Sequence, residues 1–119
     1  MRLLSSLALL LIIIMLFNSE TKSELSIDTD LKILIAQSEE GNPDAKFYLG
    51  SLYYIGRELK QDYSKAIELF KEASERGNIA ATFNLGIIYA KGRGVEIDEK
   101  KAFDYYKKAA FGGLPQAQY

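Results

Sequence analysis

A repeat of 36 residues constrains the fold of this chain more than any other feature. Gly41, Gly77 and Gly113 begin successive units at equal spacing, since 77 − 41 and 113 − 77 both give 36. The first two units are identical at 14 of their 36 positions without a gap, and a third unit is begun at 113–119. Because a unit of this length cannot bury its apolar side alone, neighbouring units must stack on one another.

Local signals divide each unit into two short helices. In the first unit Asn42 and Pro43 are typical of a helix start, and Gly56 is typical of a helix end. Asp62 predicts the start of a second helix, so the helices are expected at 43–55 and 63–75. The second unit has the matching signals at Asn78, Gly92, Asp98 and Gly112. The predicted fold class is therefore all-α, an α/α solenoid of antiparallel helix pairs with about two and a half 36-residue repeats.

Small residues recur where the helices are expected to touch. Gly50 and Gly86 lie inside the predicted first helices, where glycine costs about 1 kcal/mol relative to alanine. Because the cost recurs at one position of the repeat, we expect the backbone of the paired helix to approach closely there. Ala66 and Ala73 are expected to play the same part on the second helix. A branched residue at either glycine should destabilise the fold by overpacking.

The two units resemble the Sel-one-like repeat (SLR) family, a branch of the tetratricopeptide-like α/α repeats, over residues 41–119. The resemblance rests on repeat-defining positions, which are Ala45, Leu49, Gly50, Tyr53, Gly56, Asp62, Ala66, Ala73, Ala81, Leu85, Gly86, Tyr89, Gly92, Asp98, Ala102 and Ala109. It implies a scaffold for protein–protein contacts. Glu58 departs from the family pattern, which has glycine there, so either Glu58 is strained or its loop relaxes.

The segment that precedes the repeats is apolar at first and then polar. Met1 and Arg2 are followed by an almost wholly apolar stretch to Phe17, which is typical of a signal peptide and short for a membrane-spanning helix of roughly 20 residues. The alternative is an uncleaved membrane anchor. The whole chain is then divided as 1–17 signal peptide or membrane anchor, 18–27 polar linker, 28–40 N-terminal capping helix, 41–76 repeat 1, 77–112 repeat 2 and 113–119 truncated start of repeat 3.

The composition excludes several classes of function. The chain has no His and no Cys, which removes the usual zinc sites and the Ser–His and Cys–His nucleophile pairs. With 15 basic and 16 acidic residues, it has no charge excess of the kind that nucleic-acid binding proteins carry. We therefore expect no enzyme activity, no cofactor, no metal and no nucleic acid, and a protein or peptide as the partner.

Partner-binding residues are expected on the first helices, at exposed positions where the two repeats differ. These positions are Lys46, Tyr48, Ser51, Tyr54, Thr82, Asn84, Ile87 and Ala90. Tyr48 and Tyr54 are the predicted anchors of a partly apolar groove, since Tyr is frequent at binding hot spots. The alternative is that both rings simply pack between neighbouring helices.

Two functions follow from these patterns. The first is an exported, periplasmic or secreted scaffold that binds a protein or peptide through the first helices. The alternative is an envelope-anchored structural subunit that organises a membrane protein complex, with residues 1–17 uncleaved. Arg57 and Arg93, which recur after the first helices, are expected to bond to helix-end carbonyls or to pair with Asp62 and Asp98.

Overall fold

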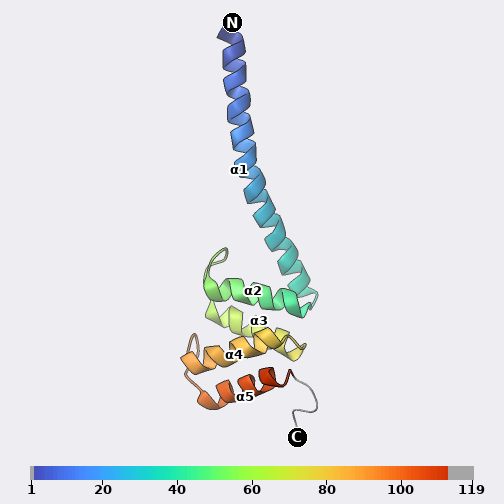
Figure 1. Ribbon diagram of the computed structural model, residues 1–119, viewed down its shortest axis with the longest axis vertical. Coiled ribbons are helices and arrows are strands. Elements are labelled where there is room, and N and C mark those ends of the chain that lie inside the picture. The colour runs from blue at the N-terminus through green and yellow to red at the C-terminus, as the bar shows by residue number, and fades with distance from the viewer. Residues whose placement is uncertain (1, 113–119) are drawn as a thin grey trace. The chain divides into compact units, whose positions relative to one another are not determined.

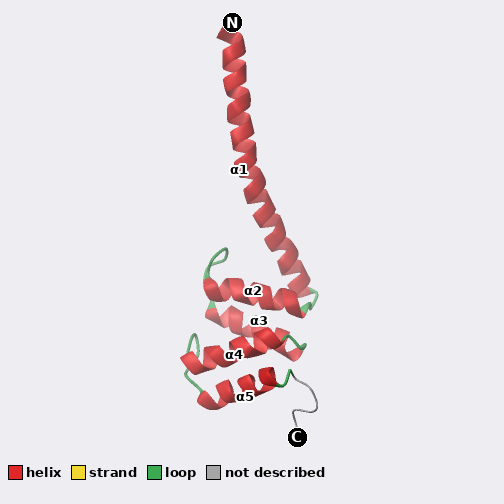
Figure 2. Ribbon diagram, in the orientation of Figure 1, coloured by secondary structure: helices red, strands yellow, loops and turns green. Residues whose placement is uncertain are grey.

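The computed structural model describes the backbone of residues 2–112 and the side chains of residues 6–15 and 27–112. This part of the chain contains helices and no strands (Figures 1 and 2). The helices are α1 (Arg2–Glu39), α2 (Pro43–Ile55), α3 (Tyr63–Glu75), α4 (Ile79–Lys91) and α5 (Glu99–Ala110). The predicted all-α class is thus confirmed. The predicted start of a third repeat, 113–119, lies outside the described residues.

The chain divides into an N-terminal part, residues 1–33, and a C-terminal part, residues 34–119. In the N-terminal part, the large apolar side chains from Leu7 to Met15 are exposed on α1. Within the described residues, no helix combines the length and the apolar character that a membrane crossing requires.

α1 differs from the prediction in its continuity. Residues 18–27, predicted as a polar linker, and 28–40, predicted as a separate capping helix, belong to one helix that ends at Glu39. The reason is local: no Gly or Pro precedes Gly41, so nothing in the sequence interrupts helical hydrogen bonding.

In the C-terminal part, helices α2 to α5 stack in chain order (Figure 1). α2 packs on α3, α3 on α4, and α4 on α5. This is the predicted succession of helix pairs, with α2 and α3 forming the first repeat and α4 and α5 the second. We refer to α2 and α4 as the first helices.

The helix ends agree with the local signals. The Asn42 side chain accepts hydrogen bonds from the backbone N–H groups of Asp44 and Ala45, and Asp62 accepts one from Lys65. Asn78 and Asp98 cap α4 and α5 in the same way. Gly56 and Gly92 end the first helices at φ of 71° and 69°, a left-handed conformation that other residues avoid.

The loops after the first helices are not identical. Gly94, in the second repeat, has φ of 72°, whereas Glu58 occupies that repeat position in the first repeat. No residue other than glycine has positive φ in the described part of the chain. The first loop therefore takes a different backbone conformation at Glu58, and the alternative of a relaxed loop is confirmed.

The core is built from small residues that let large ones interlock. Ala66, Ala73 and Ala81 are completely buried, and the largest fully buried side chains are Phe70, Leu85 and Ile88. Alanine brings the helix backbones close, because its side chain ends at Cβ, and the longer side chains then fill the space between turns.

The two helical glycines have a different role from the predicted one. A Cβ atom at Gly50 would lie 3.0 Å from Cε1 of Phe70, and one at Gly86 would lie 2.7 Å from Cδ1 of Tyr106. The group that approaches each glycine is thus an aromatic ring of the paired helix, not its backbone. Each glycine provides the flat surface on which that ring lies.

Two hydrogen bonds also tie the start of α2 to the residues between α3 and α4. A guanidinium nitrogen of Arg76 donates to the backbone oxygen of Gly41 over 2.7 Å. The amide nitrogen of Asn78 donates to the carboxylate of Asp44 over 3.0 Å. Both bonds connect the start of α2 with the α3–α4 junction, and they fix the spacing of the first helices.

Candidate functional site

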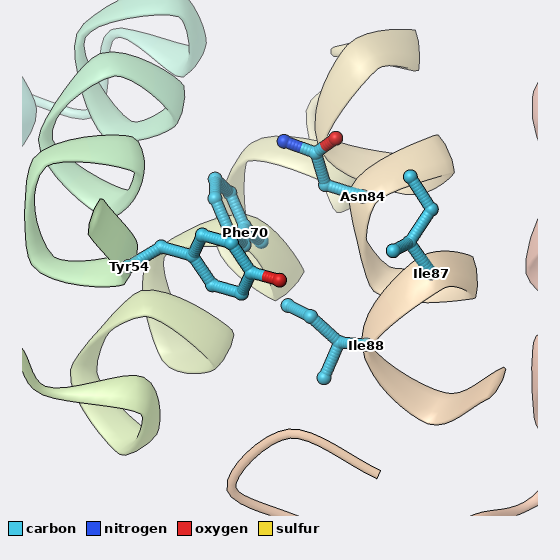
Figure 3. A pocket seen from close by; sticks show the side chains of 5 residues that line it. All are labelled: Tyr54, Phe70, Asn84, Ile87 and Ile88. Carbon is cyan, nitrogen blue, oxygen red and sulfur yellow. The ribbon is translucent and has the colours of Figure 1, made fainter. Parts of the chain in front are cut away.

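A small pocket of about 80 Å³ lies between α2, α3 and α4. It contains three of the eight predicted partner-binding residues, Tyr54, Asn84 and Ile87. Phe70 of α3 and Ile88 of α4 complete its lining, and sequence reasoning placed neither of them in a site. Figure 3 shows the Tyr54 ring reaching from α2 towards the α4 side chains.

Tyr54 is held in this pocket by other aromatic rings. Its ring centroid lies 5.4 Å from that of Tyr63 and 6.5 Å from that of Phe70, in tilted arrangements. The guanidinium carbon of Arg93 lies 5.9 Å from the same ring centroid. Tyr54 therefore packs between helices, as the alternative from the sequence predicted, and it lines the pocket as well. The surrounding rings fix its position before any partner binds.

Tyr48 lies on the same helix in a different environment. Its side chain is 59% exposed, and its ring contacts that of Phe47, its neighbour in sequence, at 5.4 Å between centroids. It is not packed between helices, in contrast to the alternative considered from the sequence. An exposed aromatic side chain with few rotatable bonds can bury a large area on contact at a small cost in entropy.

Lys46 and Thr82, predicted as exposed partner-binding positions, are buried, so the prediction of their exposure is wrong. They are 9% and 3% exposed. The Lys46 amine forms an ion pair with Glu72, and the Thr82 hydroxyl shares a hydrogen bond with Ser74. Both side chains are bonded to residues of α3, where lysine can bury its aliphatic stem if its amine finds a partner.

A chain of hydrogen bonds links polar groups of α3, α4 and α5. Lys108 donates to the Ser74 hydroxyl over 3.4 Å, Ser74 and Thr82 share a bond, and Thr82 donates to the backbone oxygen of Asn78 over 3.1 Å. In the described residues no buried side-chain nitrogen or oxygen lacks a partner. These groups therefore stabilise the helix interfaces, and none of them is left unpaired for a ligand.

The remaining predicted positions lie outside the pocket. The Ser51 hydroxyl donates to the backbone oxygen of Phe47 on its own helix over 2.9 Å, and Ala90 is exposed. In the described part of the chain, neither Arg57 nor Arg93 forms the predicted ion pair with Asp62 or Asp98.

The model of the Sel1 repeat matches residues 43–78 and 79–113, which are the two helix pairs with their caps. The chain belongs to the Sel1 repeat family. The resemblance seen in the sequence is thereby confirmed. Sel1 repeat proteins are generally scaffolds for protein–protein interactions and are generally not catalytic.

Solved Sel1 repeat structures are similar to this chain over most of its length. One is a Sel1 repeat protein from Oxalobacter formigenes, 40% identical, with a TM-score of 0.65 over 76% of this chain and 68% of that one. Another is a protective antigen present in uropathogenic Escherichia coli strains, described as displaying an SLR fold. It is 41% identical, with a TM-score of 0.67 over 74% of this chain. The match spans only 19% of the antigen. No curated protein matches the chain.

The far side of the second Sel1 repeat is apolar and open. Ile79, Phe83 and Tyr106 line a hollow of about 610 Å³ together with three alanines of α4 and α5. Phe103 of α5 is 64% exposed but does not line the hollow. Solenoid repeats stack through such surfaces.

The described residues include no cluster of side chains that could hold a metal ion. His, Cys, Asp and Glu do not gather in groups of three or more anywhere in this part of the chain. The chemistry that the Sel1 repeats do present is apolar and aromatic contact with single polar groups beside it, which suits recognition of another chain.

Proposed function

We propose that this Sel1 repeat protein is an exported scaffold that binds a protein or peptide through its first helices. The observation that carries the proposal is the pocket in which Tyr54, Asn84 and Ile87 meet. Its residues come from both repeats, so the surface depends on how the repeats stack, as is usual for solenoid binding faces.

The size of the pocket favours a macromolecular partner over a small ligand. Sites for small molecules commonly measure about 300–1,000 Å³, whereas this pocket measures about 80 Å³. Such a volume suits one side chain of a partner, inserted as an anchor between Tyr54 and Ile87. The Asn84 amide can both donate and accept a hydrogen bond, so it can pair with a peptide backbone beside that anchor.

The exposed ring of Tyr48 is expected to carry much of the binding energy. Replacing Tyr48 with alanine should weaken binding by about 2 kcal/mol or more, close to a thirtyfold rise in Kd. A photo-crosslinking residue at position 87 would first identify the partner. The affinity of the purified partner would then be measured by calorimetry against the unchanged chain and the Tyr48→Ala variant.

Phe103→Ala is the matched control for this experiment. Phe103 is also an aromatic residue of similar exposure, 64% against 59%, but it lies on α5 and not on a first helix. Its replacement should leave Kd unchanged. A partner that binds Tyr48→Ala normally and Phe103→Ala weakly would contradict the proposed face.

Export is proposed from the first seventeen residues. A basic residue at position 2 precedes an almost continuous apolar run, and the described side chains of that run, Leu7 to Met15, are exposed. An apolar run of this length after a basic start is what secretory translocation recognises. Mass spectrometry of the protein recovered from its own cells should show a mature N-terminus after Phe17. Intact Met1 on the whole population would argue for the anchored alternative.

A further inference from the structure

A second hollow, which we name the Tyr53 groove, lies within the first repeat and the last turn of α1. It measures about 360 Å³, with Leu49, Tyr53 and Leu69 on its apolar side and Ile35 at the α1 side. Of the eight predicted partner-binding residues only Lys46 lines it, and it shares no lining residue with the first-helix pocket. It is therefore a surface separate from the first-helix pocket.

The corresponding place in the second repeat is filled by the chain itself. Tyr89 and Tyr105 follow Tyr53 and Leu69 by 36 residues each. The ring of Tyr105 is stacked on that of Tyr89, with centroids 5.7 Å apart and an interplanar angle of 14°. The second repeat thus shows that an aromatic ring can stack on the tyrosine at this position of the repeat.

One lysine is placed alike in both repeats. Lys65 lies over the Tyr53 ring with its amine 5.1 Å from the centroid, and Lys101 lies over Tyr89 at the same 5.1 Å. The second repeat differs in the stacked ring and in a further lysine, Lys71, whose amine lies 5.9 Å from the Tyr89 centroid and whose counterpart in sequence is Ile35. Leu69 is half-buried, and its side chain is shorter than the tyrosine that occupies the same position in the second repeat.

The charges around the groove favour a basic neighbour for the inserted ring. Glu39 and Glu68 line the groove, and neither forms an ion pair among the described residues. The third glutamate of the lining, Glu72, is neutralised by Lys46. Lys65 is the one lysine of the lining that forms no ion pair, so the two unpaired glutamates leave one carboxylate in excess. A basic residue beside the ring would meet this excess negative charge, an interaction that steers association and fixes register.

We propose that the Tyr53 groove binds an aromatic side chain of a partner protein, with a basic residue next to it in the partner sequence. The ring stacks on Tyr53 as Tyr105 stacks on Tyr89, and the basic group lies against Glu68 and Glu39. This proposal does not depend on the first-helix pocket, and each surface can be tested alone.

The test uses acetyl-Tyr-Lys-amide as the probe and the full chain as the receptor. Titration followed by ¹H–¹⁵N NMR should give saturable shifts centred on Leu49, Tyr53 and Leu69. In the Leu69→Tyr variant the new ring should stack on Tyr53 and occupy the groove. The affinity for the probe should therefore fall at least tenfold. The reverse variant, Tyr105→Leu, should open an equivalent groove and add saturable shifts around Tyr89.

Charge and folding are controlled in the same series. Glu68→Gln should weaken acetyl-Tyr-Lys-amide more than acetyl-Tyr-amide, because only the first probe carries the cation. Circular dichroism would report whether each variant is folded. If Leu69→Tyr is not folded, the Tyr105→Leu variant decides. Probe shifts that persist in a folded Leu69→Tyr variant, or the absence of new shifts around Tyr89, would overturn the proposal.

Discussion

Replacing Phe70 with alanine is expected to lower the free energy of unfolding by about 3–5 kcal/mol. Phe70 is 1% exposed and is among the largest fully buried side chains of the described residues. Its ring contacts those of Phe47 and Tyr54, with centroids 6.0 and 6.5 Å away. Because the stability of a small domain is only about 5–15 kcal/mol in total, a large fraction of it should be lost.

The location of Phe70 makes the loss larger than that of one side chain in a single repeat. α3 packs on both α2 and α4, so the cavity left by Phe70→Ala lies where the two repeats meet. Neighbouring side chains cannot collapse into it without shifting one repeat against the other. Urea denaturation followed by circular dichroism would measure the effect.

Phe103→Ala is the control, since the same atoms are removed from an exposed side chain. Surface substitutions of this kind usually change stability by about 0.5 kcal/mol or less. Two variants with equal unfolding midpoints would show that the burial of Phe70 does not contribute as the packing indicates.

The sequence predicts the repeats well because their signals are local. Asn42 and Asp62 cap helices through bonds to backbone groups two or three residues away, and Gly56 ends one through its own φ. None of these effects requires knowledge of the rest of the fold. For this reason the predicted ranges 43–55 and 63–75 coincide with α2 and α3.

Contacts between helices could be predicted less well, because they depend on the rotation of each helix about its axis. Lys46 and Thr82 differ between repeats and looked exposed, yet their position faces a neighbouring helix. Tyr54, Asn84 and Ile87 satisfied the same criterion and do line a pocket. Difference between repeats therefore identified variable positions, but it could not separate exposed ones from buried ones.

The Tyr53 groove did leave a signal in the sequence. Leu69 and Tyr105 share a repeat position and differ in size, which is visible once the two repeats are aligned. What the alignment could not show is that this position lies over a tyrosine conserved between the two repeats, Tyr53 and Tyr89. That relation depends on how the second helix of each pair crosses the first.

Gly86→Val is expected to destabilise the protein strongly, although glycine has no side chain to lose. A Cβ atom there would lie 2.7 Å from both Cδ1 and Cε1 of Tyr106, closer than side chains pack in real proteins. Overpacking commonly costs about 1–3 kcal/mol, and the branched valine adds its own crowding. Thermal unfolding should show a clear fall in Tm.

Gly86→Ala separates the contact from the helix preference of the new residue. Alanine favours the helix by about 1 kcal/mol over glycine, so a loss of stability in this variant must come from contact with the Tyr106 ring. In the background of Tyr106→Ala, which removes that ring, the same substitution should stabilise the protein. The expected coupling in this double-mutant cycle is about 1–3 kcal/mol.

Gly50→Ala provides a graded comparison for the same contact. Its nearest aromatic atom, Cε1 of Phe70, would lie 3.0 Å from the new Cβ, compared with 2.7 Å at Gly86. Because repulsion rises steeply at these distances, the loss at position 50 should be smaller than at position 86. If the order were reversed, or if Gly86→Ala stabilised the protein while Tyr106 is present, the aromatic ring would not be what requires glycine at this position of the repeat.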